Sequence, residues 1–149
     1  MSLKTIGTIE IPGCAGSSFD HGAFDPKSRR VFLAHTGRDC VEVIDHDARR
    51  HIATLPGFPE AAGVVADDGM VLVTNRGSAS LAWVDALSLE TRAVFKTGLR
   101  PNGVAILPQH ALAIAASIGD ENQGASSRYW ALTVPKNTRS TSPGGRDGA

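Results

Sequence analysis

Residues 71–84 read VLVTNRGSASLAWV, and Asp85 follows them directly. Two short apolar segments flank the segment NRGSA at residues 75–79. The β-branched and aromatic side chains of the flanks suit the pleated surface of a sheet, whereas Asn, Gly and Ser suit turns. The stretch therefore predicts two strands, at residues 70–75 and 80–85, joined by a turn.

The same pattern recurs along the chain with a period of 40–41 residues, because residues 22–62 align with residues 63–102. Gly22, Gly63 and Gly103 each open an apolar segment. Three further matches lie forty residues apart, namely Val31 with Val71, Gly37 with Gly77, and Asp45 with Asp85. A period of this length is typical of solenoid and propeller repeats.

Each repeat divides into short apolar segments separated by Gly, Asp, Asn, Ser and Pro. The expected strands cover residues 22–25, 30–35, 40–45, 50–55, 63–67, 70–75, 80–85, 91–97, 103–107 and 111–117. A helical period is weak throughout; residues 85–94 (DALSLETRAV) come nearest, and they occupy a turn position of the repeat. Four strands in about forty residues make one blade of a β-propeller.

We therefore expect an all-β fold, a partial β-propeller of four-stranded antiparallel blades, over residues 1–127. The sequence supplies two full blades and a half-blade, and residues 5–13 (TIGTIEIPG) resemble the end of a repeat. That segment is predicted to be an N-terminal strand of the kind that closes a propeller ring. Because propellers need about four to eight blades to close, two blade faces stay open. We expect a marginal monomer, or self-association through those faces.

Within the blades, two kinds of residue have expected structural roles. The residues predicted to pack one blade on the next are Leu33, Val43, Val73 and Trp83. Asp45 and Asp85 each follow a strand, where a carboxylate accepts hydrogen bonds from the N–H groups of its own turn.

The C-terminal segment, residues 128–149, departs from the repeat. It carries four basic residues and one acidic residue, whereas residues 1–127 carry 11 basic and 14 acidic ones. Its last fourteen residues hold no Val, Ile, Leu, Met or aromatic side chain, so they cannot build a core. We expect residues 128–149 to be irregular, as a disordered tail or as the frameshifted or truncated end of a longer propeller gene.

Composition excludes several classes of protein. The net charge is zero, which gives no electrostatic footprint for nucleic acid or anionic lipid. The sequence has no apolar run long enough to span a membrane and no apolar signal core, so we expect a cytoplasmic protein. The two cysteines, Cys14 and Cys40, have neither a zinc-knuckle spacing nor a disulfide framework, and are expected to be ordinary buried or half-buried thiols.

Residues 71–85, together with residues 100–108 (RPNGVAILP), closely resemble the YVTN-type repeat of β-propellers. Residues 31–35 and 41–45 (VEVID) match the same template, and the resemblance covers about residues 5–119. It implies a WD40/YVTN-like propeller. It does not imply one function, because this architecture carries binding proteins, lactonases and quinoprotein or haem domains.

In a propeller, the residue before each innermost strand lies beside the central channel. The positions expected to face the channel and bind a ligand are His21, Glu60, Asn75, Arg76, Arg100 and Asn102. We expect a scaffold that binds a small molecule or a protein, with no cofactor and no catalysis by this chain alone.

The alternative is a metal-dependent hydrolase or its remnant. Residues 101–103 (PNG) are similar to the segment that supplies an asparagine metal ligand in gluconolactonase-like propellers. That resemblance implies Ca²⁺ or Zn²⁺ held by Asn102 with His21, where the ion polarises a lactone carbonyl and activates water. Glu10 lies in the predicted outer strand, away from the place of the family's first ligand, and a later blade that supplies an aspartate is absent from the sequence.

Overall fold

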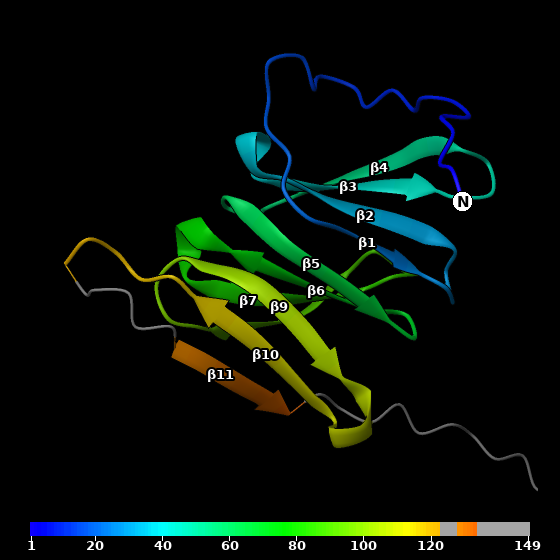
Figure 1. The fold of residues 1–149 in the computed structure, drawn as a ribbon. Coiled ribbons are helices and arrows are strands. Elements are labelled where there is room, and N and C mark those ends of the chain that lie inside the picture. The colour runs from blue at the N-terminus through cyan, green and yellow to red at the C-terminus, as the bar shows by residue number, and fades with distance from the viewer. Residues whose placement is uncertain (123–127, 134–149) are drawn as a thin grey trace, which may run out of the picture.

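The computed structural model describes residues 1–122 and the main chain of residues 128–133. Within these residues the chain forms three antiparallel sheets, which confirms the predicted all-β fold (Figure 1). Blade 1 contains β1 (Gly22–Asp25), β2 (Arg30–His35), β3 (Cys40–Asp45) and β4 (Arg50–Pro56). Blade 2 contains β5 (Ala61–Asp67), β6 (Met70–Asn75), β7 (Ser80–Asp85) and β8 (Thr91–Lys96). Blade 3 contains β9 (Pro101–Leu107), β10 (Leu112–Ser117) and β11 (Arg128–Thr133).

The strand boundaries follow the repeat closely. β5 and β9 each begin two residues before the glycine at which the sequence pattern opened them, at Ala61 and Pro101. One-turn 3₁₀ helices join the second and third strands of blades 1 and 2, η1 (Thr36–Arg38) and η2 (Arg76–Ser78), whereas η3 (Pro108–His110) joins the first and second strands of blade 3. Residues 85–94 form a turn and the start of β8 instead of a helix.

The blades pack face to face through alternate residues of their strands. Phe32, Ala34, Val41 and Val43 of blade 1 meet Val71, Val73, Ala82 and Val84 of blade 2 in one buried core. Leu72 and Leu81, on the other face of blade 2, meet Ala113 of blade 3 in a second core. The first strands lie side by side, with β1 beside β5 and β5 beside β9, so they are the inner strands of the arc.

Two of the four predicted packing residues, Val43 and Val73, are fully buried in the first core. Trp83 is half-buried beside the second core. Leu33 is half-buried as well, but it is absent from the first core, which the neighbouring Phe32 enters. Because side chains alternate along a strand, Leu33 lies on the face of blade 1 turned away from blade 2.

Aspartates hold the turns, as predicted. Asp45 Oδ1 accepts a 2.7 Å hydrogen bond from the N–H of Ala48, and Asp85 Oδ1 accepts 2.9 Å bonds from the N–H groups of Leu87 and Ser88. Asp25, which is fully buried, caps its own turn and also accepts the N–H of Gly69 from blade 2. This carboxylate therefore ties two blades together.

The predicted N-terminal strand is not formed. No strand is assigned over residues 1–21, so residues 5–13 belong to none of the sheets. A strand needs the edge of another strand as its partner, and the described residues contain no further blade for this segment to complete. The chain instead crosses blade 1 (blue in Figure 1), where Arg38 Nη1 donates to the carbonyl oxygens of Pro12 and Gly13 at 3.1 Å.

The predicted irregular segment also differs from the structure at its start. Residues 128–133 form β11, which pairs with β10 and gives blade 3 a third strand. The sequence there, RYWALT, is rich in residues that favour strands, although it no longer follows the repeat. Residues 134–149 lie outside the described residues. The described part of the chain contains no long apolar helix of the kind that crosses a bilayer.

Candidate functional site

Four polar side chains from three blades meet where the inner strands begin. Arg76 Nη2 donates to Asp20 Oδ2 and, at 2.6 Å, to Asn102 Oδ1. Asp20 Oδ1 lies 2.5 Å from His21 Nδ1. We call Asp20, His21, Arg76 and Asn102 the inner-strand cluster. Asp20 and His21 precede β1, Arg76 follows β6, and Asn102 lies in β9, so the cluster joins all three blades.

Hydrogen bonds to main-chain carbonyl oxygens, both within and between blades, hold these residues in place. The N–H of His21 donates to the carbonyl oxygen of Ala62 at 3.2 Å, and the N–H of Arg76 donates to that of Glu60 at 3.2 Å. Thr74 Oγ1 donates to the carbonyl oxygen of Asn102 at 2.7 Å. These bonds fix the main chain at His21, Arg76 and Asn102, from which side chains of the cluster extend.

The structure separates the other predicted site residues from this cluster. Glu60 and Arg100 occupy equivalent turns, with φ angles of 48° and 51°, and both side chains are exposed. Their carbonyl oxygens accept the N–H groups of Arg76 and Ile118. Their geometry is that of turn residues.

Asn75 lies behind the cluster, and its side chain is only 3% exposed. Asn75 Nδ2 donates to Ser80 Oγ at 3.2 Å. Asn75 Oδ1 and the neighbouring Arg76 Nε are buried and have no hydrogen-bond partner among the described residues. Unpaired buried polar atoms of this kind cost stability.

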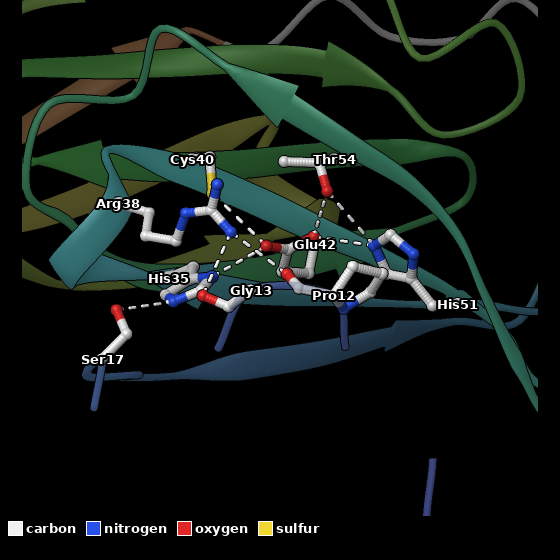
Figure 2. A network of polar contacts seen from close by, with 9 residues as sticks. All are labelled: Pro12, Gly13, Ser17, His35, Arg38, Cys40, Glu42, His51 and Thr54. Atoms are coloured by element: carbon white, nitrogen blue, oxygen red, sulfur yellow. Dashed lines mark hydrogen bonds and ion pairs between the residues drawn. The ribbon is translucent and has the colours of Figure 1, made fainter. Parts of the chain in front are cut away.

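A second polar group lies inside blade 1 (Figure 2). Glu42, in β3, is fully buried, and its carboxylate accepts hydrogen bonds from four side chains. Oε1 accepts from His35 Nδ1 at 2.7 Å and from Cys40 Sγ at 3.4 Å. Oε2 accepts from His51 Nε2 at 2.7 Å and from Thr54 Oγ1 at 2.6 Å. We call these five residues the Glu42 network.

The electrostatics of the network follow from these bonds. Burial raises the pKa of Glu42, but the bonds from Thr54, His35 and His51 outweigh burial and lower the pKa to about 2, so the carboxylate is ionised. Burial, with the nearby Glu42 charge, raises the pKa of the Cys40 thiol to about 11. Cys40 is therefore a protonated thiol, in keeping with the expected buried thiol, and Cys14 is half-buried.

The N-terminal segment covers the Glu42 network. Ser17 Oγ lies 2.8 Å from His35 Nε2, and the ring of Phe19 stacks on the His35 ring with centroids 4.1 Å apart. The N–H of Gly37 donates to the carbonyl oxygen of Ser18 at 3.1 Å. Residues 17–19, which follow the segment predicted as a strand, thus cover this polar network.

Sequence reasoning missed Glu42, although the repeat itself holds a signal. Glu42 lies forty residues before Ala82, and both side chains lie on the same face of their blades. In blade 2 this position is apolar and belongs to the core. A carboxylate at a position that the repeat reserves for the core requires buried partners, which His35 and His51 provide.

No family model matches this sequence, and neither does any curated protein. Solved structures do resemble it. Hydrazine synthase from Kuenenia stuttgartiensis gives a TM-score of 0.63 at 19% identity, over 74% of this chain and 33% of that one. Dihydro-heme d1 dehydrogenase NirN, in complex with DHE, gives 0.56 at 19% identity, over 78% and 28%. Apo AztD from Citrobacter koseri gives 0.54 at 14% identity, over 64% and 27%.

These neighbours are β-propeller proteins, and the likeness shows that this chain has a propeller fold. The chain spans about a third or less of the length of each of them. At identities below 20% the likeness carries the fold alone.

Proposed function

We propose that this chain is a binding scaffold, the part of a YVTN-type β-propeller that holds a small carboxylate ligand at the inner-strand cluster. The observation that supports the proposal is Arg76, a guanidinium placed between blades 1 and 3 by bonds to Asp20 and Asn102. Both of these bonds use Nη2, and Nε is buried, so Nη1 is the group left to donate to a ligand. Its hydrogen bond to a carboxylate is charge-assisted and therefore stronger than a bond between neutral groups.

The other members of the cluster fit the same role. His21 has more than half of its side chain exposed, so it reaches solvent beside Arg76. The side-chain oxygen of Asn102, Oδ1, accepts the bond from Arg76, which leaves the Nδ2 hydrogens as donors. The ligand therefore meets donors from two blades. Binding would depend on how those blades are packed.

The geometry favours this scaffold over a metal-dependent hydrolase. The Asn102 oxygen, which the hydrolase reading assigns to Ca²⁺ or Zn²⁺, accepts a hydrogen bond from a guanidinium at 2.6 Å. A divalent ion at that oxygen would meet the positive charge of Arg76. Calcium and zinc titrations of the wild type and of Asn102→Ala, with a lactone hydrolysis assay, separate the two functions: metal binding or turnover that disappears in the variant would support the hydrolase.

The test of the scaffold is a titration of the full chain with succinate and citrate, followed by amide chemical shifts and by calorimetry. We expect binding to the wild type that weakens at least about tenfold in Arg76→Ala, the loss expected for a charge-assisted pair. Arg92→Ala is the matched control, because Arg92 lies on β8 and, among the described residues, its polar contacts are with Asp85, Ser88 and Glu90. The absence of binding to both acids, or equal binding in Arg76→Ala, would overturn the proposal.

A further inference from the structure

Three metal-binding residue types meet in the interior of blade 1. His35 ends β2 and pairs across the sheet with Cys40, the first residue of β3. Glu42 lies two residues further along β3, so it points to the same face as Cys40. One ligand atom from each of these residues lies within 4.8 Å of the others (Figure 2). Neighbouring strands of one rigid sheet hold all three.

We infer that His35, Cys40 and Glu42 form a buried Zn²⁺ site. The set offers an imidazole nitrogen, a sulfur and a carboxylate oxygen, which are the three ligand types that zinc takes in proteins. Calcium and magnesium prefer oxygen ligands alone and are excluded by the sulfur and the imidazole. Three protein ligands leave one position of a tetrahedron for water or a further ligand.

Charge is the second argument. The Glu42 carboxylate is 0% exposed, and neither Lys nor Arg forms an ion pair with it among the described residues. Hydrogen bonds alone meet the charge of this carboxylate, and no permanent cation neutralises it. Zn²⁺ supplies the missing positive charge. Its binding releases the thiol proton of Cys40 to solvent, because the thiolate is the ligand.

The surroundings of the three residues are those of ordered metal ligands. Ser17 Oγ lies 2.8 Å from His35 Nε2 and so orients the ring with Nδ1 toward Glu42. Thr54 and His51 hold the second oxygen of Glu42. Partners of this kind, which fix a ligand through its other polar atom, accompany most protein metal sites. The stacked Phe19 ring shields the site from water.

Comparison of the blades shows that the repeat does not need these residues. The positions that correspond to His35, Cys40 and Glu42 in blade 2 are Asn75, Ser80 and Ala82, which contain neither a sulfur nor a charged group. Blade 2 forms an equivalent sheet without them. The metal-binding types in blade 1 therefore require a reason other than folding of the blade, and a bound ion provides it.

The test uses the full chain, stripped with a chelator and titrated with Zn²⁺ by calorimetry and with Co²⁺ by absorption spectroscopy. We expect one Zn²⁺ per chain and a thiolate-to-cobalt charge-transfer band. Cys40→Ser should abolish the band and weaken zinc binding at least about tenfold. Loss of an outer partner already costs about that much in metal affinity, and loss of a direct ligand should cost no less. Cys14→Ser is the matched control, since Cys14 is the other cysteine of the sequence, and it should behave as the wild type.

Three further variants complete the test of the zinc site. Ser17→Ala should weaken zinc binding by about tenfold while it keeps the cobalt band, the effect of losing an outer partner. Glu42→Gln keeps the size of the side chain and tests the site again if circular dichroism shows that Cys40→Ser is unfolded. The inference is overturned if the wild type gives no cobalt–thiolate band, if the band survives Cys40→Ser, or if zinc binding is lost in Asn102→Ala alone.

Discussion

A Cβ atom on Gly63 would lie 2.0 Å from the main-chain carbonyl oxygen of Asn102. Gly63 lies in β5 and Asn102 in β9, so the inner strands of blades 2 and 3 approach each other more closely than any side chain allows. The same Asn102 oxygen accepts the hydroxyl of Thr74 and therefore cannot move away without the loss of that bond. The glycine at this point of the repeat is a packing requirement.

Gly63→Ala should therefore destabilise the chain. Added atoms in a closely packed interior typically cost about 1–3 kcal/mol, and here the clash is with backbone, which yields less than a side chain. We expect a lower urea midpoint with an unchanged slope. Gly103→Ala is the control, because a Cβ there meets nothing within 4 Å, and its stability should stay within about 0.5 kcal/mol of the wild type. Equal losses in the two variants would contradict close packing as the cause.

The buried carboxylate of Asp25 makes stability depend on pH. Burial raises its pKa, but hydrogen bonds from Ser28 and Gly69 outweigh burial, and the net pKa lies below the ordinary value for an aspartate. A group with a lowered pKa in the folded state stabilises the fold above its unfolded pKa, and loses that contribution as the pH falls through the folded pKa. Asp25→Asn should cost about 1–3 kcal/mol at pH 7 and should flatten the fall in stability below pH about 4.

Asp85→Asn provides the comparison for Asp25→Asn. Asp85 accepts the Ser88 N–H, which is the main reason that its pKa is lowered, but its side chain is 34% exposed and it caps only its own turn. Solvent screens such a group, so its effect should be smaller. Urea unfolding at a series of pH values measures both variants, and a larger change for Asp85→Asn would refute the special role of Asp25.

The fold could be read from the sequence because its signals are local and repeated. Glycines, aspartates and short β-branched segments recur every 40–41 residues, and a turn signal repeated in register sets strand boundaries better than a single one. The Asp45 and Asp85 caps followed from the same reasoning, because a carboxylate after a strand bonds within its own turn.

The remaining features depend on what lies across space. Residues 5–13 have the pattern of a strand, yet a strand forms only beside a partner edge, which pattern alone does not supply. For a similar reason, only some of the predicted ligand-binding positions come together in the structure. Arg76 and Asn102 meet because β6 and β9 belong to adjacent blades, whereas Glu60 and Arg100 point into solvent from equivalent turns. The partners that allow Glu42 to be buried come from β2 and β4, so they became evident only in the structure.

The Asp20–Arg76 pair should contribute measurably to the docking of blade 1 on blade 2. Both side chains are 22% exposed, so the pair is less screened than an open surface pair. A double-mutant cycle of Asp20→Ala and Arg76→Ala should give a coupling free energy of about 1 kcal/mol. The control cycle uses Lys27 and Asp68, a 3.5 Å pair with 44% and 53% exposure, and should give about 0.3 kcal/mol. A coupling no larger than that of the control would show that the inner-strand cluster does not join the blades.

The free face of blade 3 should drive self-association of the chain. Val104, Ile106 and Ala113 face blade 2, so the alternate residues of the same strands lie on the opposite face. These are Ala105, Leu107, Leu112, Ile114 and Ala116. All are apolar, and in the described structure no further blade covers them. An uncovered apolar face favours contact with a second copy, since burial of apolar surface is worth roughly 25 cal/mol for each Å².

Ile114→Lys tests this face directly. A charge on the free face should shift the sedimentation profile toward the monomer at high protein concentration, because burying an unpaired ammonium between copies is costly. Val94→Lys is the matched control, since Val94 is 62% exposed and pairs in β8 with Ala82, on the face of blade 2 turned toward blade 1. The folded state of both variants is checked by circular dichroism. A wild type that sediments as a monomer at every concentration, or equal effects of the two lysines, would exclude blade 3 as the contact surface.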